Sequence, residues 1–203
     1  MDEAKRQQLA LLRAQVARLE AELAAEEQAQ WPPRTYYTAY HVLAGFVLGM
    51  FGAATSLLLN VVGSLLVGQE PLRLIQVYLT IPLGRAPLEP GFNNNLALAV
   101  GCCLYLATGM LLGIPFHLVL SRWLSKASFT ARLAAVSVLA LGVWLVNFYG
   151  ILWWLQPLLF GGRWIVEQIP WWVAALTHLV FGWTMVLVQP LGTFIPYGGS
   201  EAA

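Results

Sequence analysis

The composition of this 203-residue chain excludes an ordinary soluble protein. Hydrophobic residues make up 59% of the chain and charged residues only 10%, whereas soluble domains carry roughly 25% charged residues. The net charge is +1, and no basic cluster interleaved with aromatic residues occurs, which argues against nucleic-acid binding. Arginine outnumbers lysine nine to two, a bias typical of GC-rich bacterial genomes, and we therefore take the chain as bacterial.

The N-terminal region is expected to form a helix. Residues 2–30 contain no Gly or Pro and are rich in strong helix formers. Apolar residues recur at spacings of 3, 4, 3 and 4, as in a coiled-coil seam: Leu9, Leu12, Val16, Leu19 and Leu23. We expect region 1–31 to be a cytoplasmic amphipathic helix whose seam contacts a partner chain, or else a solvated helix against the membrane or its own protein. The prolines of the linker 32–39 end it.

Four apolar runs predict an all-α integral membrane protein with four transmembrane helices, since about 20 mainly apolar residues cross the hydrocarbon core. Within a membrane domain at 40–197, these runs lie at about 40–67, 96–120, 133–160 and 171–195. The loop 68–95 contains four prolines and is too interrupted to span, although its first part is expected to be a short interfacial helix. A tail of residues 198–203 follows the domain.

The distribution of basic residues predicts the orientation. The connection between the second and third spans holds Arg122, Lys126 and Arg132 and no acid, which is typical of a cytoplasmic loop. With four spans, eight bases then lie inside and three lie outside, so loop 68–95 faces outward. We expect an integral protein of the bacterial cytoplasmic membrane with both termini in the cytoplasm.

Small and polar residues follow one face of the first two spans. The first span carries five of them at spacings of 4, 3, 4 and 4: Gly45, Gly49, Gly52, Ser56 and Asn60. The second repeats the pattern with Gly109 and Gly113. Small residues let membrane helices approach closely, and Asn60 can hydrogen-bond across such a contact. These faces predict close helix packing, either inside the bundle or against a neighbouring protein.

Three histidines are the candidate ligand residues. His41 and His117 are expected at similar depth near the inner face, where a bis-histidine haem b is conceivable, although interfacial hydrogen bonds are the simpler interpretation. His178 shares a stripe of the fourth span with Ala174, Gly182, Met185 and Gln189, and an interhelical hydrogen bond is expected there. The three histidines have no zinc-ligand spacing, so we predict no metal site and no cofactor other than the possible haem.

Two functions are compatible with this sequence. No Asp, Glu, Lys or Arg lies within the predicted spans, which disfavours ion-coupled transport, and no catalytic motif occurs. We favour a non-catalytic accessory or structural subunit of a larger membrane complex, foremost a respiratory electron-transfer complex that is an oxidase or oxidises quinol. Its partners would be other membrane subunits and lipids. The alternative is a small haem b-binding or transporting membrane protein that acts by itself.

Overall fold

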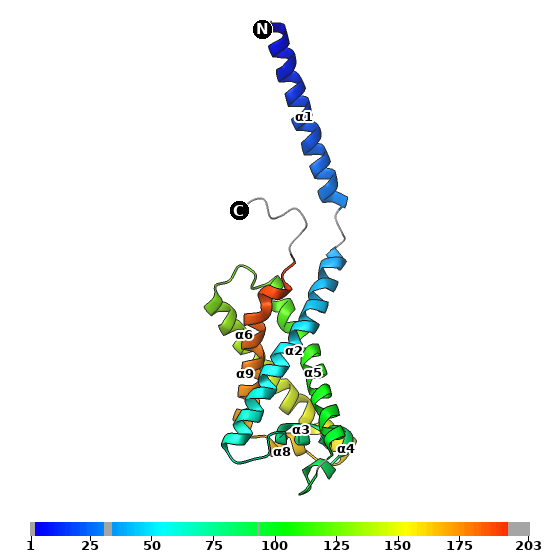
Figure 1. The fold of residues 1–203 in the computed structure, drawn as a ribbon, viewed down its shortest axis with the longest axis vertical. Coiled ribbons are helices and arrows are strands. Elements are labelled where there is room, and N and C mark those ends of the chain that lie inside the picture. Colours follow the sequence, from blue (N-terminus) through cyan, green and yellow to red (C-terminus); the bar gives the residue numbers. More distant parts are fainter. Residues whose placement is uncertain (1–2, 31–33, 93, 195–203) are drawn as a thin grey trace. The chain divides into compact units, whose positions relative to one another are not determined.

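The described chain is helical throughout. The computed structural model describes residues 3–30, 34–92 and 94–194, and over these ranges it contains helices and no strands (Figure 1). The chain divides into two units with the boundary after Thr38. The expected tail 198–203, residue 31 and the first part of the proline linker, residues 32 and 33, lie outside the described residues.

The first unit contains one long helix. Helix α1 spans Glu3–Gln30. Its five seam residues are all exposed, at 48–61% of their full accessibility: Leu9, Leu12, Val16, Leu19 and Leu23. An i,i+4 ion pair joins Arg18 to Glu22 on its surface, with Nε 2.9 Å from Oε1. That the seam takes part in a coiled coil stays a prediction.

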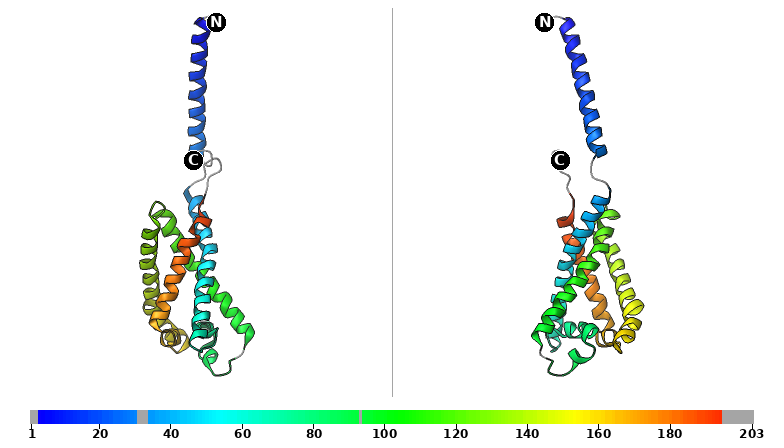
Figure 2. Two further views of the ribbon diagram at one scale, coloured as in Figure 1. Left: turned by 60° about the vertical axis from the view of Figure 1, so that its left-hand side comes forward. Right: turned by 90° about the vertical axis from the view of Figure 1, so that its right-hand side faces the viewer.

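Within the described ranges, four helices are long and apolar enough to cross a membrane, which confirms the four long apolar helices expected from the sequence. They comprise α2 (Arg34–Leu66), α5 (Asn95–Arg122), the continuous segment Phe129–Phe160, and α9 (Trp171–Val188) extended by the 3-10 turn η3 (Gln189–Gly192). Figure 2 shows the long helices of the second unit side by side. Two of them begin at polar caps, because the Asn94 and Ser128 side chains accept hydrogen bonds from backbone N–H groups three residues later.

The third span is not a regular α-helix. It consists of α6 (Phe129–Leu145), the π-helical segment η2 (Val146–Leu152) and α7 (Trp153–Phe160). A π-helical turn holds more residues than an α-turn and therefore changes which side chains face the bundle. Helix α7 ends at Gly161, whose φ of +82° lies in the left-handed region that glycine adopts without strain.

A layer of short helices covers the end of the bundle at which α2 finishes (Figure 1). It contains α3 (Arg73–Tyr78), α4 (Thr80–Leu83), η1 (Ala86–Leu88) and α8 (Trp164–Gln168). The buried Gln156 of α7 joins this layer to the third span: its Nε2 donates to Thr80 Oγ1 at 2.8 Å, and its Oε1 accepts from Ile165 N at 3.0 Å. One amide thus holds α4, α7 and α8 together.

The core of the second unit lies between α2, α5, α6 and α9. Its buried residues come from all four helices: Leu48, Ala53, Phe116, Leu120, Val136, Ala140, Phe181, Met185 and Val186. A smaller cluster joins α3, η2, α8 and α9 through Val77, Phe148, Ile165 and Ala174. Lipid supplies no hydrophobic drive for helix association, so these contacts act through dispersion and packing.

Candidate functional site

Helices α2 and α5 make a close contact through glycines. A Cβ atom built on Gly49 would lie 2.9 Å from the Cα atoms of both Met110 and Gly113, and one built on Gly45 would lie 2.9 Å from the Cα of Ile114. Such distances are too short for any real side chain, so these backbones touch directly. The structure thus places Gly45 and Gly49 of α2 against Gly109 and Gly113 of α5 within one chain.

The remaining seam residues of α2 face different partners. A Cβ on Gly52 would meet the Phe181 ring of α9 at 2.8 Å. Ser56 Oγ donates to Ala53 O at 2.9 Å and lies 2.9 Å from the hydroxyl of Tyr105 on α5. Asn60 Nδ2 donates to Thr177 Oγ1 of α9 at 2.9 Å, and it also reaches the Ser56 carbonyl. The stripe therefore contacts α5 along its first part and both α5 and α9 along its second.

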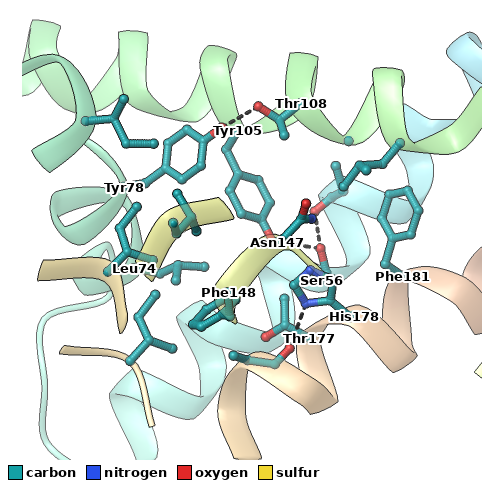
Figure 3. A pocket seen from close by; sticks show the side chains of 18 of the residues that line it. Ser56, Leu74, Tyr78, Tyr105, Thr108, Asn147, Phe148, Thr177, His178 and Phe181 are labelled. Carbon is teal, nitrogen blue, oxygen red and sulfur yellow. Dashed lines mark hydrogen bonds between the residues drawn. The ribbon is translucent and has the colours of Figure 1, made fainter. Parts of the chain in front are cut away.

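A cavity of about 330 Å³ lies next to this contact (Figure 3). Its walls come from α2, α3, α4, α5, η2, α8 and α9. Most of its surface is apolar, with aliphatic side chains and the rings of Phe148 and Phe181. The polar side chains on the lining are Ser56, Tyr78, Tyr105, Thr108, Asn147, Thr177 and His178.

Two hydrogen-bonded pairs form one side of the cavity. Tyr105 bonds to Ser56 across the α2–α5 interface, and the hydroxyl of Tyr78 on α3 bonds to Thr108 Oγ1 on α5 (Figure 3). The two tyrosine rings pack edge to face, with centroids 5.7 Å apart. These pairs fix the orientation of both rings and connect the layer of short helices to the bundle.

His178 makes a different contact from the interhelical hydrogen bond expected from its sequence. Its Nδ1 donates to the carbonyl oxygen of Ala174, 2.8 Å away and one turn earlier on α9. Its contact with the third span is an edge-to-face packing on the Phe148 ring, with centroids 6.2 Å apart. Because a carbonyl can only accept, Nδ1 carries the hydrogen, and the neutral imidazole then presents Nε2 as an acceptor.

Asn147 is a lining residue that sequence reasoning missed. It lies in η2, and its amide has no hydrogen-bond partner among the described residues. A polar residue in the middle of a long apolar run was the available signal, because an amide in a membrane helix needs a partner. The periodicity of an α-helix does not predict where a residue in a π-helical turn points, so its position on the cavity was not foreseeable.

The structure also brings His41 and His117 together. His41 Nδ1 lies 3.4 Å from His117 Nε2, and the latter is 3.2 Å from Ser121 Oγ. A haem held by two histidines requires its iron and the plane of the macrocycle between the two ring nitrogens. Here the nitrogens contact each other, and His117 is fully buried, with Gly192 against its ring. These residues do not fit a haem between them, and we assign the pair to packing between α2 and α5.

A comparison of this chain with protein-family models, with curated proteins and with solved structures finds no match. The described residues form a helical bundle with four helices long and apolar enough to cross a membrane.

Proposed function

We propose that this chain is a non-catalytic accessory subunit of a larger membrane complex, attached in part through α1. The observation that carries the proposal is the exposed apolar seam on that helix. Its five members are spaced for pairing with a second helix and remain about half exposed or more: Leu9, Leu12, Val16, Leu19 and Leu23.

The energetics of an exposed seam favour a partner. Burying one such side chain stabilises a contact by roughly 1.5 to 3 kcal/mol. A single helix in water is only marginally stable. The entropy that its backbone loses on ordering is compensated mainly by the packing of its apolar face. A second helix that inserts its own side chains between these residues supplies that packing.

The charges beside the seam support a protein partner rather than lipid. Glu20 and Glu22 occupy positions next to the second half of the seam, and anionic lipid headgroups would repel them. Arg18 is already paired with Glu22. The complementary partner is a helix of another subunit with basic residues opposite these two acids.

Within this class we favour a bacterial respiratory electron-transfer complex, either an oxidase or a quinol-oxidising complex, because such assemblies are rich in small accessory membrane subunits. We place both termini in the cytoplasm on the strength of the eight bases inside and three outside. The partner helix would then lie on the cytoplasmic side.

The test uses the full chain, expressed with an affinity tag in its native host. One variant combines Leu12→Ser, Leu19→Ser and Leu23→Ser and removes most of the seam. A matched control combines Ala14→Ser, Ala17→Ser and Ala21→Ser, which introduces the same three side chains on other exposed positions of α1. Both are solubilised in mild detergent, and the co-purifying proteins are quantified by mass spectrometry.

We expect the seam variant to insert into the membrane yet lose its co-purifying subunits at least tenfold, while the control retains them. Electron-transfer subunits among those partners would support the respiratory assignment. Full retention of partners by the seam variant, or recovery of nothing but copies of this chain, would contradict the proposal.

A further inference from the structure

We propose that the cavity between α2, α5, η2 and α9 binds an uncharged, largely apolar molecule that carries a ring hydroxyl group, such as a phenol or a quinol. This inference does not depend on the subunit role. The cavity volume of about 330 Å³ falls within the roughly 300 to 1,000 Å³ typical of small-molecule sites. A site of this size accommodates a substituted six-membered ring.

The lining determines the charge and the shape of the ligand. None of the described residues on the cavity wall is Asp, Glu, Lys or Arg. A charged ligand would be buried without a counter-charge, which is strongly unfavourable. Aromatic side chains border the space from four elements: Tyr78 on α3, Tyr105 on α5, Phe148 on η2 and Phe181 on α9. Flat rings pack well between such faces.

Two polar groups on the lining determine which functional group the ligand presents. His178 Nε2 is an acceptor, because Nδ1 donates to Ala174 O. The Asn147 amide offers both a donor and an acceptor. Neither His178 Nε2 nor the Asn147 amide has a protein partner among the described residues. The fully buried side-chain atoms that lack a partner among these residues are two others, His117 Nδ1 and Trp144 Nε1.

A hydroxyl group on the ligand can bond to both His178 and Asn147. Its hydrogen is donated to His178 Nε2, and its oxygen, or a second oxygen on the ring, accepts from Asn147. Polar groups inside proteins are hydrogen-bonded as a rule, and a membrane interior offers few alternative partners. An ether or a hydrocarbon of the same shape leaves the histidine without a donor.

The local backbone is consistent with a binding role. Four residues of η2 line the cavity: Asn147, Phe148, Ile151 and Leu152. Single π-helical turns are frequent at functional sites, because they are less stable than α-helix and turn particular side chains inward. Here the turn brings the amide to a wall that an unbroken α6 would present differently.

The experiment measures binding of tritiated 4-nonylphenol to the full chain in lipid nanodiscs, with empty nanodiscs subtracted. The matched probe is 4-nonylanisole, in which a methyl ether replaces the hydroxyl. We expect saturable binding of the phenol and binding of the ether that is roughly three- to tenfold weaker, as loss of one hydrogen bond predicts. Reduced decylubiquinol, as a third probe, separates a quinol site from a simple phenol site.

Two variants test whether the ligand hydroxyl bonds to His178 and to Asn147. His178→Phe should weaken phenol binding three- to tenfold and abolish the preference for phenol over ether, whereas Asn147→Leu should weaken phenol binding by a similar factor. The matched control is His41→Phe, the same substitution outside the cavity, which should leave both affinities unchanged. Thermal unfolding of each variant checks that it is folded.

Three outcomes would overturn the proposal. Phenol uptake equal to that of empty nanodiscs would mean that only water occupies the cavity. Equal binding of phenol and ether to the unmodified chain would leave a hydrocarbon site without hydroxyl recognition. A preference for the phenol that persists in His178→Phe would place the hydroxyl elsewhere.

Discussion

Two parts of the α2–α5 interface differ in what the facing residues allow. Around Gly49 the two backbones touch, because glycine meets glycine and no side chain separates them. Beyond Ala53, Ser56 faces the large side chain of Tyr105, and the cavity opens beside this pair. The same two helices thus pack without space in one part and border a cavity in the other, and the size of the facing residues accounts for the difference.

The two parts also differ in the forces that hold them. The glycine contact depends on dispersion between closely spaced backbones, which falls off steeply with distance. The cavity side depends on directed hydrogen bonds, from Asn60 to Thr177 and between Ser56 and Tyr105. A membrane bundle therefore tolerates a cavity where polar side chains tie its helices together.

The largest expected effect comes from widening the close contact. Gly49→Leu forces its side chain into the backbone of α5. It should lower the free energy of unfolding by about 3 kcal/mol or more, the upper end of the usual cost of overpacking a core. The measurement is the midpoint of thermal unfolding in detergent micelles.

Its control is Gly63→Leu, the same substitution in the same helix, where a Cβ meets nothing within 4 Å. Leu58→Ala, at a leucine that is 62% exposed, should also have little effect. Equal loss of stability in Gly49→Leu and Gly63→Leu would show that the glycine contact is not what holds α2 against α5.

A smaller effect is expected on the cavity side. Tyr105→Phe removes the hydroxyl that bonds to Ser56, while Ser56 keeps its bond to Ala53 O, so the free energy of unfolding should fall by about 1 kcal/mol. The matched control is Tyr149→Phe, because Tyr149 is 46% exposed. An unchanged unfolding midpoint in Tyr105→Phe would mean that the Ser56 bond contributes nothing to holding the helices beside the cavity.

The smallest effect distinguishes contact glycines from those outside a contact. Gly142→Ala on α6 should stabilise the chain by up to about 1 kcal/mol, since a Cβ there meets nothing within 4 Å and alanine favours helix. The same change at Gly109 should destabilise, because the new methyl would collide with the Cβ atom of Ala53 and lie 3.3 Å from both Gly49 O and Ala53 Cα. A shift of the same sign at both positions would contradict the distinction between the two glycines.

Sequence reasoning identified the residues of the α2 stripe but not all of their partners. Glycine spacing shows which side of a helix can approach another, and this led to Gly45, Gly49, Gly109 and Gly113. It does not identify the opposite helix, and Gly52 and Asn60 in fact meet α9 through Phe181 and Thr177. Partner choice depends on how four helices cross, which no single helix encodes.

The candidate site was less predictable than the fold. His178 was visible as a polar residue in an apolar span, yet its hydrogen bond runs to its own helix. Asn147 was passed over, because its direction depends on the π-helical turn. The layer of short helices was anticipated by one interfacial segment, whereas α4 and α8 are held in place by Gln156 of a distant helix.

The sequence by itself determined that the chain forms four helices long and apolar enough to span a membrane. Transfer of a helix into lipid is a sum over about 20 consecutive residues, so local composition decides it. Only the tertiary structure decided that the glycine faces meet within the chain and that a cavity with Asn147 and His178 on its wall lies beside them. Those features depend on contacts between side chains of helices that are far apart in sequence. A transfer free energy summed over consecutive residues does not predict such contacts.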